Sequence, residues 1–363
     1  MGNCLRYGVG FTLFWDILMV ARQVRESRAR DTGVWCGLLA MVSLFLLLGA
    51  GPGAISDIPE FGTFVDEIAS RHGFERDELV AIFAKARLQP AVLKAMSQPA
   101  EKKPWHSYRE IFINDKRIRD GAKFMQLNAK TLLEARKAYG IPAEMTTAIL
   151  GVETGYGKRT GRHLVLDTLA TLAFNYPPRA KLFRHELEHY LLLLREENIR
   201  PRSMKGSYAG AMGIAQFMPS SYRRYAVDFD GDGKRDLTRS VKDAIGSVGN
   251  YFREHGWKAD APVAVRTRIT VDANRLWLER GSRIKRRVDE WIQLGAEPVE
   301  ALAGHWQATL IVLEGKSGPE HWFGFHNFHV ITEYNHSTNY AMAVYQLSQD
   351  VEALRHKNIA AAN

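Results

Sequence analysis

The chain has 363 residues, of which 46% are hydrophobic and 25% charged, and its formal net charge is +9. This length and composition are those of a globular protein and allow about two or three domains. The basic residues are scattered. This excludes a nucleic-acid-binding arm and leaves a basic surface or a polyanionic partner such as a membrane or an acidic polymer.

Residues 1–56 have the pattern of a targeting leader. Basic residues come first, an apolar run over 34–51 follows, and the small, helix-breaking segment Gly51-Pro52-Gly53 comes last. This order is typical of a signal sequence, although the run is also just long enough to span a membrane. We therefore predict export, with the leader either cleaved within 49–58 or kept as an anchor. The basic residues are Arg22, Arg25, Arg28 and Arg30.

Cys4 and Cys36 are the only cysteines, and both lie in the leader. The exported part has no thiol, which excludes a disulfide, a cysteine nucleophile and a zinc–thiolate site. Cys36 stands at the start of the apolar run rather than after it. It is therefore not placed as the acylated cysteine of a bacterial lipoprotein.

An N-terminal helical domain is predicted over 57–140. Apolar residues recur at helical spacing over 61–68, 76–87 and 122–139. Between them, the aromatic and partly basic segment 108–113 has two interpretations. It could line a sugar-binding groove, since aromatic faces stack on sugar rings, or it could be a packed helix face.

One glutamate, Glu153, stands at the end of an apolar run. The segment 142–144 starts a helix, and Met145, Ile149 and Glu153 then share one face at i, i+4 and i+8. Gly155-Tyr156-Gly157 ends the helix. A carboxyl group on an apolar face has its charged form disfavoured, so its pKa should rise to suit a general acid. The alternative is a helix-end glutamate that turns to solvent.

The middle of the chain carries the densest motifs. Apolar helices are predicted over 164–175 and 183–197, separated by a double proline. The segment 205–222 follows, rich in small residues, with Ser207 and Gln216 among its few polar groups. Its glycines allow close backbone approach, and its polar groups could orient a ligand. The alternative is tight helix packing by small residues.

The segment Asp228-Phe229-Asp230-Gly231-Asp232-Gly233-Lys234-Arg235-Asp236 has acids at positions 1, 3, 5 and 9 and matches the first half of a calcium-binding EF-hand loop. Position 12 is Arg239 rather than glutamate, so we expect Asp243 to close a longer loop. Alternatively, Ser240 and Asp243 form a capping box. Clustered acids repel one another without a cation, so we predict a structural Ca²⁺ or Na⁺ site. The predicted ligands are Asp228, Asp230, Asp232, the Lys234 carbonyl and Asp243.

The order of predicted elements gives an α+β fold that is mainly helical. A helix is expected over 243–257, strands over 261–271, 306–313 and 321–332, and a last helix over 341–354. Helices, then short strands, then a helix again argue for a small β subdomain within a helical protein.

Several long motifs resemble those of the lytic murein transglycosylase B family. They are Gly151-Val152-Glu153-Thr154, Ala173-Phe174-Asn175-Tyr176-Pro177, Ser207-Tyr208-Ala209-Gly210-Ala211-Met212-Gly213, Gln216-Phe217-Met218-Pro219-Ser220-Ser221-Tyr222 and Tyr334-Asn335-His336-Ser337-Thr338. The resemblance runs from about Ile58 to Leu354. It implies a lysozyme-like catalytic core with an N-terminal helical domain and a small β domain.

The resemblance also implies the reaction. The β-1,4 bond between N-acetylmuramic acid and N-acetylglucosamine in peptidoglycan is cleaved without added water, which leaves 1,6-anhydro ends for cell-wall remodelling. Glu153 matches the single catalytic acid/base. The residues that match the cleft lining are Ser207, Gln216, Tyr251, Asn335 and Tyr340, while Tyr108 and Arg179 resemble outer contacts to sugar or peptide. The acid loop matches a cation site of the family, and no cofactor is implied for catalysis.

A single acid agrees with this reaction. Ordinary glycosidases flank the bond with two carboxylates, whereas only Glu153 stands among the groove motifs here. It would protonate the leaving oxygen, and the 2-acetamido group of the sugar would stabilise the charge at C1. The 6-hydroxyl would then close the ring with Glu153 as base. Two alternatives stay open: a hydrolytic muramidase on the same scaffold, and a non-catalytic wall-binding or calcium-dependent scaffold protein.

The expected division of the chain follows from these elements. It is a leader over 1–56, a helical domain over 57–140, a catalytic core over 141–260, a β subdomain over 261–325 and a C-terminal segment over 326–363 that returns to the core. We expect a periplasmic monomer that binds peptidoglycan glycan strands and no nucleic acid. The leader leaves association with the inner or outer membrane open, and peptidoglycan synthases are candidate protein partners.

Overall fold

The computed structural model describes residues 53–97, 103–270 and 285–362, and the predicted leader lies almost entirely outside them. The described part begins with the short helix η1 (Ile55–Asp57), followed by α2 (Pro59–His72), α3 (Arg76–Phe83) and α4 (Pro90–Met96). A proline at the first position starts both α2 and α4. Because α3 ends at Phe83, the helix predicted over 76–87 is confirmed only as far as that residue.

The helix predicted over 122–139 is two helices. They are α6 (Asp115–Leu127) and α7 (Ala129–Tyr139), which meet at Asn128, where φ is −114° and ψ is 21°. The break lies at a residue that favours turns over helix interiors, since its side chain competes for backbone hydrogen bonds. Before them, α5 (Trp105–Phe112) buries Trp105, Tyr108 and Phe112. The segment 108–113 is thus a packed helix face for the most part.

The central helices agree with their predicted ranges to within a few residues. They are α8 (Ala143–Thr154), α9 (Val165–Asn175), α10 (Ala180–Glu196) and α12 (Val241–Glu254), with a short helix η3 (Pro177–Arg179) between α9 and α10. The short helix α11 (Pro219–Tyr225) lies at the downstream end of the small-residue segment. Two-residue strands, β1 (His163–Leu164) and β2 (Lys205–Gly206), pair antiparallel and were not predicted.

The strands after residue 260 form one antiparallel sheet in the order β4-β6-β7-β3-β5. A short helix, α14 (Val288–Gln293), packs on it through Trp291, whose indole N–H donates to the Ala308 carbonyl at 3.0 Å. This small core is separate from the main helical core. The strands are β3 (Ala264–Ile269), β4 (Arg286–Arg287), β5 (Ala296–Pro298), β6 (Gln307–Gly315) and β7 (Gly318–Gly324).

The strand predicted over 321–332 is wrong beyond Gly324. The chain leaves β7 there and forms α15 (His326–Tyr334), then α16 (Thr338–Ala362). Short apolar runs do not distinguish a strand from a buried helix, and this run contains one of each. Among the described residues, no helix combines the length and apolar character that a membrane span requires.

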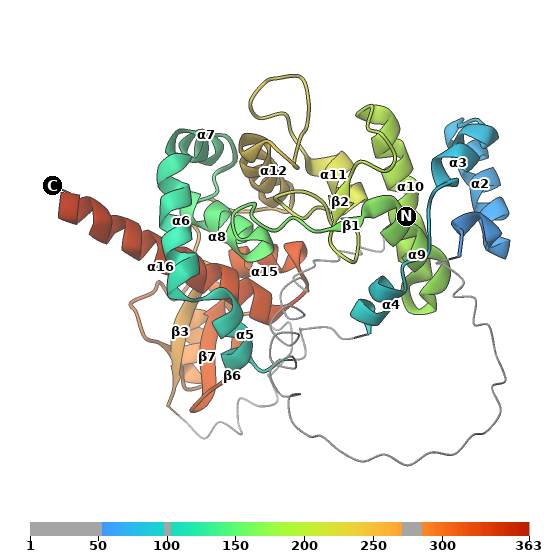
Figure 1. Cartoon of the computed structure of the whole chain (residues 1–363). Helices are drawn as coiled ribbons and strands as arrows, with labels where there is room; N and C mark the ends of the chain where they lie inside the picture. The colour runs from blue at the N-terminus through green and yellow to red at the C-terminus, as the bar shows by residue number, and fades with distance from the viewer. Residues whose placement is uncertain (1–52, 98–102, 271–284, 363) are drawn as a thin grey trace, which may run out of the picture.

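The last helix brings the end of the chain back to the centre. α16 packs against α8, α6, α5 and α15. Figure 1 shows α8 between two ends of the molecule, with β3, β6 and β7 beneath α16 at one end and α2 and α3 beside α10 at the other. The helices that pack on α8 are α6, α7, α12 and α16, and α8 is buried on every side from Met145 to Thr154.

Candidate active site

Glu153 lies in the last turn of α8 with only 3% of its surface exposed. The helix ends at Gly155, whose φ of 59° is left-handed and costs a glycine little. The Gly155 N–H donates to the Gly151 carbonyl at 3.0 Å, which closes the turn directly beneath Glu153. The burial expected from the helical spacing is confirmed, and a glutamate turned to solvent is not what the fold contains.

The carboxyl group of Glu153 has one close polar partner. The Tyr340 hydroxyl, from α16, donates to its Oε1 at 2.6 Å, and its Oε2 is buried without a hydrogen-bond partner among the described residues. Burial raises the pKa of Glu153 to about 8, against the opposing effect of the Tyr340 hydrogen bond. The group is therefore mostly protonated at neutral pH and can act as an acid.

Tyr334 is a neighbour of this pair that the sequence did not single out. Its ring stacks on that of Tyr340 at 6.4 Å with an interplanar angle of 11°. Its hydroxyl donates to the Ala215 carbonyl at 2.5 Å, which links α15 to the small-residue segment. Burial, with the Glu153 charge nearby, raises the pKa of Tyr334 well above its usual value. The only available signal was its place in the motif that begins at residue 334.

The small-residue segment 205–218 packs tightly against the end of α8. Thr154 donates its hydroxyl to the Ile214 carbonyl at 2.9 Å. Ser207 is buried, and its Oγ accepts from the backbone N–H groups of Ala209 and Ala211 at 3.3 and 3.0 Å. A Cβ on Gly206 would stand 2.3 Å from the Ala211 oxygen, so no larger residue fits there. The tight packing predicted as the alternative is confirmed, and the segment also lines a pocket through Gln216, Phe217 and Met218.

Gln216 adopts a conformation that is unusual for its residue type. Its φ is 51°, in the left-handed region where a residue other than glycine costs about 1–3 kcal/mol. Its side-chain amide donates to the carbonyls of Gly213 and Thr160 at 2.8 and 3.1 Å. These bonds and the surrounding fold hold a strained residue at the pocket, and strained residues are concentrated at functional sites.

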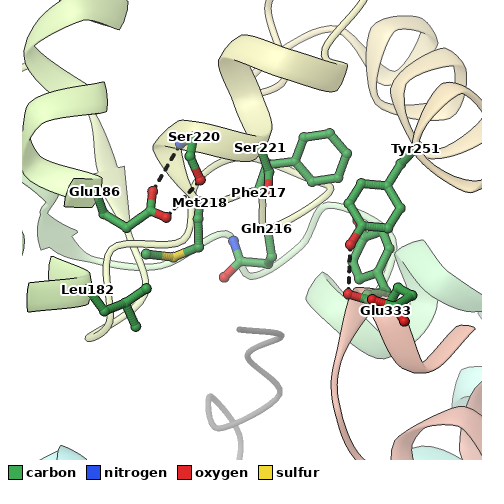
Figure 2. A pocket seen from close by; sticks show the side chains of 10 residues that line it. Leu182, Glu186, Gln216, Phe217, Met218, Ser220, Ser221, Tyr251 and Glu333 are labelled. Carbon is green, nitrogen blue, oxygen red and sulfur yellow. Dashed lines mark hydrogen bonds between the residues drawn. The ribbon is translucent and has the colours of Figure 1, made fainter. Parts of the chain in front are cut away.

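A pocket opens beside this segment, with Gln216 on one side and Tyr251 on the other (Figure 2). The Tyr251 ring packs on Phe217 at 5.6 Å and on Tyr334 at 4.9 Å, and its hydroxyl donates to the Glu333 carbonyl at 2.6 Å. Tyr334 contacts the Glu153–Tyr340 pair and also lines the pocket. The lining residues are Leu182, Glu186, Gln216, Phe217, Met218, Ser220, Ser221, Tyr251, Glu333 and Tyr334.

Two of these lining residues, Glu186 and Glu333, are acids that the sequence did not identify. Glu186 is 4% exposed, and both of its oxygens accept hydrogen bonds from Ser220. Glu333 lies on the opposite wall of the pocket (Figure 2). Its place next to Tyr334 in the matched motif was the only signal for it, while Glu186 stands in a leucine-rich helix where no motif points to it.

The remaining predicted site residues differ in burial and in their place in the fold: they are Asn335, Tyr108 and Arg179. Asn335 is buried at the end of α15, next to Tyr334. Tyr108 is 1% exposed, with its ring 5.0 Å from Phe112 and its hydroxyl close enough to affect the pKa of Tyr340. Its side chain is buried in the core of the helical part, which corrects the expectation of an outer sugar contact. Arg179 is exposed at the end of η3, apart from this cluster.

The acid loop brings three carboxylates together. One oxygen each from Asp228, Asp230 and Asp232 lies within 4.8 Å of the others. Hard oxygen ligands at this separation fit a cation such as Ca²⁺. Asp243 is fully buried and accepts from the backbone N–H groups of Phe229 and Asp236 at 2.9 and 2.8 Å. It therefore holds the loop to the first turn of α12 by accepting hydrogen bonds from the backbone of the loop.

The capping box predicted for Ser240 and Asp243 is only half formed, because the Ser240 N–H donates to the Asp236 carbonyl rather than to the Asp243 carboxylate, while Ser240 itself caps α12. Its Oγ accepts from the Asp243 N–H at 3.1 Å at the start of α12, and its hydroxyl donates to Asp230 at 2.9 Å. Burial raises the pKa of Asp243, opposed by its backbone hydrogen bonds, while the nearby Asp230 charge adds to the rise. The loop thus joins the start of α12 to three acids that could hold a cation.

Known proteins resemble this chain over most of its length. The family model for the transglycosylase SLT domain matches residues 58–349. Membrane-bound lytic murein transglycosylase B of Escherichia coli (strain K12) is 42% identical over 313 residues, which are 84% of this chain and 85% of that protein.

Solved structures agree with this sequence similarity. The Escherichia coli lytic transglycosylase Slt35 in complex with calcium superposes with a TM-score of 0.77 at 42% identity, over 84% of this chain and 96% of that one. SltB3 from Pseudomonas aeruginosa, in complex with NAG-anhNAM-pentapeptide, superposes with a TM-score of 0.73 at 32% identity, over 81% of this chain and 79% of that one.

Proposed function

The chain belongs to the transglycosylase SLT domain family and is a lytic transglycosylase of peptidoglycan, and on that premise we propose that Glu153 is its acid/base. The observation that carries this proposal is the burial of Glu153 at the end of α8, with a pKa raised to about 8. A carboxyl group in that state holds a proton at neutral pH and can donate it to the oxygen of the breaking glycosidic bond.

The reaction then needs a nucleophile other than water. As the bond to the leaving oxygen breaks, the 2-acetamido oxygen of N-acetylmuramic acid stabilises the positive charge at C1. Glu153, now ionised, accepts the proton of the 6-hydroxyl, whose oxygen bonds to C1 and closes the 1,6-anhydro ring. The Tyr340 hydroxyl supports this second step, because its hydrogen bond stabilises the ionised form of Glu153.

Hydrolysis on the same scaffold would need a second carboxylate that activates water. Glu186 is poorly suited to that task, since both of its oxygens are bound by Ser220. Glu333 lines the pocket and is the remaining acid for a hydrolytic variant of the mechanism. The anhydro sugar in the SltB3 complex favours the non-hydrolytic course.

The pocket residues would hold the glycan strand. We assign binding of the sugar at the cleavage point to Ser207, Gln216, Tyr251, Asn335 and Tyr340. Of these, Gln216 and Tyr251 line the pocket, while the other three are buried side chains outside its lining. Arg179 is exposed and would contact a more distant sugar or peptide. A cleft with aromatic walls and few polar groups suits a sugar chain, whose rings have apolar faces and polar edges.

A structural cation is proposed at the acid loop. Asp228, Asp230 and Asp232 would supply carboxylate oxygens, the Lys234 carbonyl would supply another, and Asp243 would brace the loop through its backbone contacts. Calcium is the favoured ion because the related Slt35 structure contains it. The role is structural, since the loop joins α11 to α12 away from Glu153.

The proposed setting is the periplasm. The substrate lies outside the cytoplasmic membrane, and the leader over residues 1–56 has the pattern of an export signal or anchor. We keep the division into a helical domain over 57–140, a catalytic core over 141–260, a β subdomain over 261–325 and a returning C-terminal segment over 326–363. The separate core of the sheet supports the boundary of the β subdomain, whereas one continuous core runs through the helical domain and the catalytic core.

Glu153→Gln tests the function directly. The amide cannot donate a proton as an acid does, so cleavage of peptidoglycan should fall by at least ~10²–10⁴-fold in a folded protein. Mass spectrometry of the digest identifies the reaction: anhydro ends from the native protein indicate the lytic reaction, and reducing ends indicate hydrolysis. Glu144→Gln, at the other end of α8, is the matched control and should cleave normally. Near-normal turnover by folded Glu153→Gln would remove Glu153 from its role.

A further inference from the structure

Glu186 is a buried acid in a helix face that is otherwise apolar. Phe183, Leu187 and Tyr190 of α10 are all fully buried, and Glu186 stands among them with 4% of its surface exposed. Burial raises the pKa of its carboxyl group, and the hydrogen bonds from Ser220 oppose that rise. Burying a carboxyl group is unfavourable unless hydrogen bonds satisfy it, so its partners indicate what it stabilises.

Both oxygens of Glu186 bind the same residue on another element. The Ser220 N–H donates to Oε2 at 2.9 Å, and the Ser220 hydroxyl donates to Oε1 at 2.7 Å (Figure 2). Ser220 follows Met218 by two positions, where the small-residue segment runs into α11. The pair of bonds therefore ties the downstream end of that segment to α10.

The segment 214–218 is one that needs such a support. It contains Gln216 with a φ of 51°, a conformation that persists only where the surroundings enforce it. Upstream of Gln216, the Ile214 N–H donates to the Leu237 carbonyl at 2.7 Å, and the Ala215 carbonyl accepts from Tyr334 at 2.5 Å. Downstream, the Glu186–Ser220 pair holds the other end, so Gln216 is held from both sides.

We propose that Glu186 is a positioning residue for glycan binding, which bridges α10 to Ser220 and thereby keeps Gln216 in place at the pocket. The inference rests on the proposed role of Gln216 and extends it to a residue on another helix. Glu186 acts as a hydrogen-bond bridge rather than as a charge. A neutral amide of the same shape can accept from the Ser220 N–H and donate to its hydroxyl oxygen, so it can preserve the bridge.

Binding is measured in the Glu153→Gln background, so that turnover does not intervene. The probe is a soluble fragment of alternating N-acetylglucosamine and N-acetylmuramic acid, titrated by calorimetry. Adding Glu186→Leu, which keeps the volume and removes the bridge, should weaken the Kd about tenfold or more. Adding Glu186→Gln should restore binding to near the level of the parent. Glu188→Gln, on the same helix and paired with Arg71, is the control and should leave the Kd unchanged.

The kinetics of Glu186→Leu in the otherwise native protein show whether the substitution misplaces Gln216 or only lowers the amount of folded enzyme. Glu186→Leu should raise KM and leave kcat unchanged. The fall of kcat/KM at alkaline pH, which follows the loss of the Glu153 proton, should also stay at the same pH. A protein that is merely part-unfolded would instead show a lower kcat at an unchanged KM.

Three results would overturn the bridge. They are a folded Glu186→Leu protein with the parent Kd, a Glu186→Gln protein as impaired as Glu186→Leu, and a change confined to kcat. If Glu186→Leu does not fold, the Kd of Ser220→Ala tests the bridge instead, because this substitution removes only the hydroxyl contact with Glu186. A Kd weakened several-fold supports the bridge, and an unchanged Kd overturns it. Cleavage by Glu153→Gln alone would instead defeat the proposed function, and the KM of Glu186→Leu in the otherwise native protein would still test the bridge.

Discussion

The buried carboxyl group of Glu153 has an energetic cost that depends on pH. Its pKa is about 8 in the folded protein and about 4.3 in an unfolded chain. Between those values the unfolded state releases a proton that the native state keeps, so this group makes the protein less stable as pH rises. The same burial that prepares Glu153 to donate a proton therefore destabilises the native state near neutral pH.

Glu153→Gln should remove this pH dependence, because the amide does not titrate. The free energy of unfolding of the variant, relative to the native protein, should rise by about 3 kcal/mol between pH 5 and pH 7, at ~1.4 kcal/mol per pH unit. Urea unfolding of both proteins at the two pH values measures the difference. A gap that stays the same at both pH values would mean that Glu153 titrates normally.

Tyr340 sets the balance between the two forms of Glu153. Its hydrogen bond lowers the pKa of the carboxyl group, so Tyr340→Phe should raise that pKa further. The alkaline limb of kcat/KM, which follows the protonated acid, should then move above its native position near pH 8, while kcat falls because the ionised base is less stabilised. A pH–rate profile with soluble glycan measures both effects.

Tyr334→Phe is the matched control for Tyr340→Phe. It also removes a buried hydroxyl from a stacked ring, but that hydroxyl donates to the Ala215 carbonyl rather than to Glu153. The alkaline limb should stay in place in this variant. An equal displacement in both variants would show that ring packing, and not the Tyr340 hydrogen bond, tunes Glu153.

At the scale of elements, the acid loop joins the end of α11 to the start of α12. Its backbone is organised by its own carboxylates: Asp228 accepts from the N–H groups of Gly231 and Gly233 at 2.8 Å each. Asp243 ties the loop to α12. Because α12 carries Tyr251, the loop supports the far wall of the pocket, and a cation bound there should stabilise that wall.

Calcium should raise the melting temperature of the protein. A ligand that binds only the native state stabilises it by about 2.7 kcal/mol at a hundredfold excess over Kd. Asp230→Asn should weaken this response. Asp236→Asn removes the same charge from the same loop but outside the three-acid cluster, at a residue that accepts from Thr238 and Arg239, so its response should persist. A melting curve that is identical in calcium and in chelator would show that hydrogen bonds alone maintain the loop.

At the scale of the whole molecule, the chain encloses α8 with helices that lie far apart in the sequence, namely α6, α7, α12 and α16. α16 packs on α8 and supplies Tyr340, while α10 supplies the support beneath Ser220. The sheet of β3 to β7 has its own core and touches the helical part through α5 and α15. The cleft is therefore a property of the assembled protein, and no single segment contains it.

The proposed export can be tested on the whole protein. Cell fractionation and sequencing of the mature N-terminus should find a periplasmic protein that begins within residues 49–58, since a barely spanning apolar run followed by Gly51-Pro52-Gly53 suits cleavage. A full-length protein in the membrane fraction would identify the leader as an anchor. A full-length cytoplasmic protein would contradict the location, and with it access to peptidoglycan.

The sequence by itself determined what depends on neighbours along the chain. The burial of Glu153 followed from helical spacing and the closing glycines, and the acid loop followed from acids that alternate within a few residues. Helices with clear periodicity were predicted to within a few residues. Failures came where a local signal was ambiguous: Asn128 splits one helix, and Gly324 separates a strand from α15 within one apolar run.

Only the tertiary structure decided which side chains meet. Glu153 and Tyr340 lie 187 positions apart in the chain, and Glu186 lies 34 positions from Ser220. Likewise, α5, which carries the buried Tyr108, packs on α16 from more than two hundred positions away in the chain. Such pairs depend on the docking of whole helices, which is driven by non-directional burial of apolar surface, so no spacing along the chain predicts them. The acid was therefore evident from the sequence, whereas the hydrogen bond from Tyr340 that tunes it and the contact of Glu186 with Ser220 became evident only in the folded protein.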